Sequence, residues 1–192
     1  MIINHNKNKL LNLIIYFVKS TKHCGKTKLF KLLFFADFEC FKKTGKSITG
    51  LVYFTWPKGP APIALANEFK SPSEDFKNIF SVVKFDESDQ LNIIPKKNVK
   101  FDPQHFTKKE LAIISNVAYV YRNAFAKDMV EISHLKNSPW QKTLDSKGKN
   151  KFIDYILAFD NDKDSLTLDQ YKEFEEADDA IDTILSTCAE AK

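Results

Sequence analysis

Residues 27–43 are the part of this sequence that most restricts how the chain can fold. Apolar side chains would occupy most of the circumference of a helix formed here: Leu29, Phe30, Leu32, Leu33, Phe34, Phe35, Ala36, Phe38 and Phe41. A helix that is hydrophobic nearly all round has no face suited to water, so such helices are usually buried. The sequence therefore predicts a central helix over residues 27–43.

Two other segments have the periodicity of amphipathic helices. Apolar residues recur at helical spacing over residues 10–18, and Gly25 can end that helix. Thr107 followed by Glu110 is a capping-box pattern just ahead of a long apolar stripe that runs to Phe125. These patterns predict one helix near the N-terminus and one in the second half of the chain.

The later part of the chain carries weaker signals. Asp128 and Glu131 repeat the cap-like spacing and predict a short helix that contains Ser133 and His134. The polar and basic residues 145–150 predict a loop. Beyond them, residues 168–188 have the apolar spacing of an acidic amphipathic helix.

Three short segments are typical of β-strands. Residues 52–56 are rich in β-formers and end at a proline, and residues 79–85 and 91–94 predict a hairpin. We expect them to form one small antiparallel sheet of about three strands. Pro60 and Pro62 suit the first turn of the helix that follows.

The predicted fold class is α+β and mainly α: a compact helical domain with a small antiparallel β-sheet. No linker is evident, so residues 1–192 are expected to form a single domain. Residues 160–192 hold 3 Lys and 11 Asp or Glu, a net charge of −8, whereas the rest carries +12. We expect residues 160–192 to form an acidic C-terminal helix that packs on the domain or extends from it.

Cysteine usage and hydropathy predict a cytoplasmic protein. Three scattered cysteines, Cys24, Cys40 and Cys188, are too few for a disulfide framework, and their odd number favours a reducing compartment. No apolar run approaches the roughly 20 residues that a membrane span needs. The apolar run at residues 10–18 is short and lacks the cleavage site of a signal peptide.

No residue pattern in the sequence predicts catalysis. Gly25-Lys26-Thr27 and Gly45-Lys46-Ser47 resemble the end of a phosphate-binding loop, but both lack the glycine five positions earlier. His23 and Cys24 lack a second pair of ligands at metal spacing. The sequence therefore predicts no catalytic residue, no metal site and no cofactor, and a protein that is not an enzyme.

A series of short motifs resembles one known family. Residues 29–39 read Leu-Phe-Lys-Leu-Leu-Phe-Phe-Ala-Asp-Phe-Glu, residues 44–50 form a Gly-containing turn, and residues 53–62 lead from a strand into Gly-Pro-Ala-Pro. Ser133-His134 and a downstream Trp140 follow in the same order. Over roughly residues 8–145 the chain resembles the SocA-like antitoxins, which contain the Panacea domain. Ala61 and Ser47 are mild departures from the family pattern.

The resemblance implies a non-catalytic bacterial or phage-associated antitoxin that neutralises a toxin encoded nearby by binding it directly. One alternative within the family is an adaptor that delivers the toxin to a protease. The basic excess of residues 1–159 leaves open a nucleic-acid-binding regulator. Specific nucleic-acid binding is disfavoured, however, because Arg122 is the only arginine and lysine alone reads bases poorly.

The motif residues fall into two predicted groups. The expected partner-binding residues are Tyr53, Trp56 and Lys58. The residues expected to be structural are Gly59, Pro60, Pro62, Ser133, His134 and Trp140. For the two tryptophans, burial in the core and exposure at a binding surface both remain open.

Overall fold

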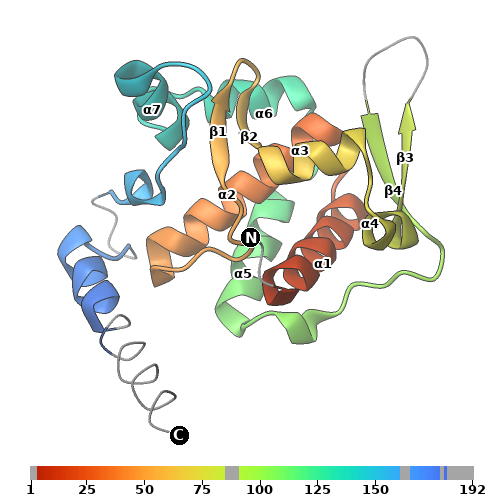
Figure 1. Cartoon of the computed structure of the whole chain (residues 1–192), viewed down its shortest axis with the longest axis horizontal. Coiled ribbons are helices and arrows are strands. Elements are labelled where there is room, and N and C mark those ends of the chain that lie inside the picture. The colour runs from red at the N-terminus through yellow and green to blue at the C-terminus, as the bar shows by residue number, and fades with distance from the viewer. Residues whose placement is uncertain (1–3, 85–90, 161–164, 178–179, 181–192) are drawn as a thin grey trace, which may run out of the picture.

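The computed structural model describes residues 4–84, 91–160, 165–177 and 180 of the chain (Figure 1). The predicted fold class is confirmed: the chain is mainly helical with a small content of antiparallel β-structure. Among these residues, no helix combines the length and apolarity needed to cross a membrane.

Helix α2, Lys26–Thr44, is the centre of the fold, as its sequence predicts (Figure 1). It contacts α1 (Asn4–Ser20), α5 (Lys108–Val120) and α6 (Ala126–Ser133), together with parts of both β-hairpins. Its residues supply much of the hydrophobic core, including Leu29, Leu32, Leu33, Phe34 and Phe38. Because neighbours surround the helix, apolar side chains are stable on nearly every face of it.

The capping box predicted at Thr107 is present. The Thr107 side chain accepts a hydrogen bond from the Glu110 backbone N–H, and the Glu110 carboxylate accepts one from the Thr107 N–H. Glu110 also pairs with Lys9 of α1, with a distance of 2.6 Å between Lys9 Nζ and Glu110 Oε1. The start of α5 is therefore tied both to its own backbone and to α1.

Two helices differ from the sequence prediction. Residues 145–150 were predicted to be a loop, but α7, Pro139–Lys147, covers the first part of that range because Ser138 caps it and Pro139 occupies its first turn. Helix α4, Glu74–Ile79, was not predicted; Ser73 caps it. Both helices are short and each follows a capping serine, a signal too common to stand out in sequence.

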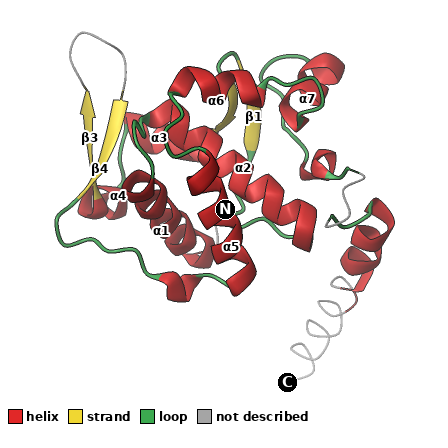
Figure 2. Cartoon of the chain, turned by 180° about the vertical axis from the view of Figure 1, so that it is seen from behind, coloured by secondary structure: helices red, strands yellow, loops and turns green. Residues whose placement is uncertain are grey.

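The strands form two separate hairpins and not one three-stranded sheet (Figure 2). Strand β1, Tyr53–Trp56, pairs with β2, Gly59–Pro62, and β3, Phe80–Lys84, pairs with β4, Leu91–Pro95. The predicted 79–85 and 91–94 hairpin is confirmed, whereas its connecting residues 85–90 lie outside the described part.

Pro60 and Pro62 were predicted to lie in the first turn of a helix, and this is wrong. Pro60 and Pro62 lie in strand β2 opposite Thr55 and Tyr53, and α3, Ile63–Lys70, starts only after Pro62. Proline is compatible with an edge strand because its missing N–H need not be paired there. The two prolines therefore favour this two-stranded ribbon as readily as a helix start.

The described part of the acidic C-terminal segment packs against the end of α2. Residues 168–177 are helical, and the Tyr171 ring lies 5.0 Å from that of Phe41, centroid to centroid. The Leu166 N–H donates to the Lys42 carbonyl. The predicted helix is present over residues 168–177, while 178–179 and 181–192 lie outside the described residues.

Candidate partner-binding site

Lys31 joins the central helix to the first hairpin. Its side chain is 2% exposed, and its Nζ donates a 2.8 Å hydrogen bond to the carbonyl oxygen of Pro60. Burial lowers the Lys31 pKa from 10.5 to about 7. This hydrogen bond from a buried amine fixes the position of β2 relative to α2.

Gly59 lets three separate segments of the chain meet at one point. Its φ of +89° is strained for any residue with a side chain. A Cβ placed there would lie 2.5 Å from Ser133 Oγ and 2.8 Å from Lys31 Cε. Helix α2, strand β2 and helix α6 therefore pack directly around the bare Cα of Gly59, which supports the prediction that this glycine is structural.

Ser133, His134 and Trp140 form a packed cluster behind this contact. Ser133 is fully buried, and its Oγ donates to the Val130 carbonyl. The His134 and Trp140 rings stack with centroids 3.9 Å apart and an interplanar angle of 10°. Burial, and then the neighbouring Lys31, lowers the His134 pKa, so the ring is neutral at pH 7.

Two ring nitrogens of this cluster are buried without a hydrogen-bond partner among the described residues: His134 Nε2 and Trp140 Nε1. Ser133 Oγ already has a hydrogen-bond acceptor and no exposed surface. The arrangement therefore favours packing for all three side chains, and nothing in it offers Ser133 to a substrate.

Tyr53 does not lie where a partner could reach it. It is fully buried, and its hydroxyl donates a 2.7 Å hydrogen bond to Asp37 Oδ2. The same carboxylate accepts from the Thr49 N–H and the Thr49 hydroxyl. Burial raises the Asp37 pKa to about 6, although these hydrogen bonds oppose the rise. The prediction that Tyr53 contacts a partner is therefore corrected: Tyr53 is part of a buried polar network.

Trp56 and Lys58, the other two residues predicted to bind a partner, are at the surface. They flank Pro57 in the turn between β1 and β2, where Trp56 is half-buried and Lys58 is exposed. Beneath this turn lies a cavity of about 350 Å³ with the first two turns of α2 as its other wall. The turn is held at its base by Thr55, whose hydroxyl donates to the Gly148 carbonyl.

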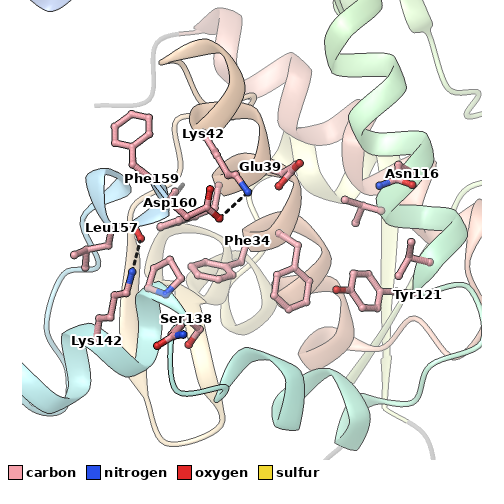
Figure 3. A pocket seen from close by; sticks show the side chains of 17 residues that line it. Phe34, Glu39, Lys42, Asn116, Tyr121, Ser138, Lys142, Leu157, Phe159 and Asp160 are labelled. Atoms are coloured by element: carbon pink, nitrogen blue, oxygen red, sulfur yellow. Dashed lines mark hydrogen bonds and ion pairs between the residues drawn. The ribbon is translucent and has the colours of Figure 1, made fainter. Parts of the chain in front are cut away.

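A second and larger cavity, of about 750 Å³, lies between α2, α5 and the segment before α7 (Figure 3). Phe34, Phe35 and Phe38 of α2 contribute aromatic surface to it, and the Phe35 ring stacks on Tyr121 with centroids 5.0 Å apart. Val120 also lines this cavity, which we call the groove, and is 58% exposed. The groove offers apolar contact area to a partner.

The charges around the groove are balanced. Lys42 Nζ lies 2.8 Å from Asp160 Oδ2, and Lys142 donates to the Leu157 carbonyl (Figure 3). Glu39 also lines the groove. Since both signs of charge alternate at its rim, the groove has no net preference for an acidic or a basic partner.

The two cysteines among the described residues are Cys24, which is half-buried, and Cys40, which is buried. Burial raises the pKa of Cys24 and of Cys40 to about 11 each, so both are protonated at pH 7. The described residues contain no group of three or more His, Cys, Asp or Glu side chains placed to hold a metal ion.

Lys31 and Asp37 were not among the site residues predicted from the sequence. They are the two charged residues within residues 29–38, whose other residues are all apolar, and both are almost completely buried. The signal that could have identified them is a charged residue on a helix face that is predicted to be buried. A buried charged group needs a specific partner.

A family model described as Antitoxin SocA-like, Panacea domain, matches residues 29–141, which include most of α2, the β1–β2 hairpin and the Ser133–Trp140 cluster. No curated protein and no solved structure matches the chain. The matched part covers more than half of the sequence, and this chain belongs to the SocA-like antitoxin family with a Panacea domain.

Proposed function

We propose that this protein is a cytoplasmic antitoxin that neutralises a toxin by binding it directly, without catalysing a reaction. Family membership supports an antitoxin role. The two cysteines among the described residues, Cys24 and Cys40, are free thiols, which agrees with a reducing compartment.

The observation that carries the proposal is the rigid hairpin turn at Trp56–Lys58. The Lys31–Pro60 hydrogen bond holds one strand, and hydrogen bonds from Thr55 to the backbone of residues 148–151 hold the other. A surface fixed before binding loses little conformational entropy on association. Tryptophan at the centre of such a surface is a common hot spot, and an exposed lysine at its rim can select the partner's charge.

The proposed function is tested by co-expressing this chain with the small protein encoded next to its gene. Growth should be restored only when the antitoxin is at least equimolar with the toxin, because each antitoxin molecule can neutralise only the toxin molecule that it binds. The two proteins should also co-purify. Full rescue at a large molar deficit would contradict occupancy; if that rescue disappeared in cells lacking a protease, it would support the adaptor function instead.

Lys58→Glu is expected to weaken the complex by at least about tenfold in Kd while leaving the melting temperature unchanged. The side chain is exposed, so reversing its charge should act on the partner and not on the fold. Lys97→Glu makes the same charge change at another exposed position and is the control. Equal weakening by both variants, measured by calorimetric titration, would show that net charge matters and that the hairpin turn does not.

A further inference from the structure

The cavity beneath the β1–β2 turn gathers three amines and no carboxylate. Lys26 and Lys31 reach it from α2, and Lys58 reaches it from the turn. None of the described residues that line it is acidic. The first turn of α2 also has no acidic residue and no side-chain cap, so the positive end of its helix dipole adds to the charge of the lysines.

The remaining walls of this cavity are apolar. Phe30 and Ala61 line its sides, and Trp56 and Pro57 come from the turn. Lys26 Nζ lies 5.6 Å from the centroid of the Phe30 ring, a cation–π distance that holds this amine in place. A cavity of about 350 Å³ with apolar walls and several amines suits a group with an aliphatic stem and an anionic end.

We propose that this cavity binds the carboxylate side chain of an Asp or Glu residue on an apolar segment of the toxin. The inference rests on the proposed function, because its ligand is a segment of the toxin. The surface involved is the same hairpin turn at Trp56–Lys58. Lys58 contacts the carboxylate at the mouth, Lys26 and Lys31 face it from α2, and Trp56 covers the neighbouring apolar residue.

Charge complementarity and shape both favour an acidic protein segment over nucleic acid. A phosphate backbone is bound by a row of exposed lysines along its track. Here the amines lie at different depths of one cavity: Lys58 is exposed, Lys26 is half-buried and Lys31 is 2% exposed. A single side chain can enter such a cavity, whereas a polymer backbone would contact only its mouth.

Binding of a carboxylate here should also take up a proton. Burial places the Lys31 pKa at about 7, and the groups that face Lys31 are cationic or neutral: Lys26, Lys58 and His134. An anion in the cavity favours the charged amine and raises the Lys31 pKa. Affinity should therefore fall as the pH rises from 7 to 9, since the amine must be protonated to bind.

The test uses the purified full chain and two blocked tripeptides, acetyl-Leu-Glu-Leu-amide and acetyl-Leu-Gln-Leu-amide. The indole N–H signals of Trp56 and Trp140 are followed by NMR, with buried Trp140 as the internal reference. The Glu peptide should shift the Trp56 signal with a Kd at least about tenfold lower than the Gln peptide. Lys58→Gln should remove most of that difference, and the control Lys97→Gln should not.

Three results would overturn the inference. They are equal binding of the two peptides, an equal loss in Lys58→Gln and Lys97→Gln, and a Trp56 shift produced by a short single-stranded oligothymidylate at lower concentration than by the Glu peptide. The last would make this a phosphate site. The peptide test needs no toxin, so it can fail while co-expression rescue succeeds, and rescue can fail while the peptide binds.

Discussion

Gly59→Ala should lower the free energy of unfolding by about 3 kcal/mol. A side chain at φ +89° costs about 1–2 kcal/mol, and overpacking a filled interior typically costs a further 1–3 kcal/mol. The overlap cannot be relieved cheaply, because Ser133 and Lys31 are buried and each is held by a hydrogen bond to a backbone carbonyl. Urea denaturation followed by circular dichroism measures the change.

Gly45→Ala is the matched control for this variant. Gly45 also has a positive φ, +73°, but an added Cβ would come no closer than 3.3 Å to Tyr171. It should cost only about 1 kcal/mol, mainly from backbone strain. Equal losses in the two variants would mean that α6 and Lys31 move aside freely, and that Gly59 does not hold the three segments together.

The sequence predicts the helical core well because its signals are strong and local. An apolar helix over residues 27–43 and a capping box at Thr107 leave few alternatives. The β-structure is harder to predict from the sequence, because Pro60 and Pro62 fit both a helix start and an edge strand. Only the distant contact between Pro60 and Lys31 decides between them.

The candidate site was predictable in part. Order and spacing of the motifs identified Trp56, Lys58 and Gly59, but they gave no measure of burial, so Tyr53 was grouped with the surface residues. The cavity beneath the turn could not be predicted, since it depends on how α2 approaches the hairpin. Local sequence does not determine the approach of elements that are far apart along the chain.

The buried amine of Lys31 should make stability depend on pH in a way that a single substitution removes. The Lys31 pKa is about 7 in the folded chain and 10.5 in the unfolded chain. Below pH 7 both states are protonated and the full cost of burying the charge is present. Between pH 7 and 10.5 the unfolded state binds more protons than the folded state, so stability rises with pH.

Lys31→Met keeps an unbranched side chain of similar length and removes the titrating group. The free energy of unfolding of the natural chain minus that of Lys31→Met should therefore rise by about 3 kcal/mol between pH 6.5 and 9.5. His134 titrates below this window because its pKa is lowered, and both thiols have folded pKa values of about 11. The thiol contributions are common to both proteins and cancel in the difference. The His134 contribution does not cancel fully, because Lys31 is one cause of its lowered pKa, but it falls at the low-pH end of the window.

Lys28→Met is the comparison that separates a buried neutral amine from a buried charged one. Lys28 is also buried, but its Nζ lies within hydrogen-bond distance of three carbonyl oxygens, those of Lys22, Arg122 and Ala124. Burial lowers the Lys28 pKa, but the three acceptors and the nearby Asp128 favour the ammonium form. Removing Lys28 should therefore destabilise the chain at pH 7 and leave a smaller pH dependence than Lys31→Met. A flat difference for Lys31→Met between pH 6.5 and 9.5 would show that Lys31 stays charged in the fold, and that the cavity beneath the hairpin holds a permanent cation.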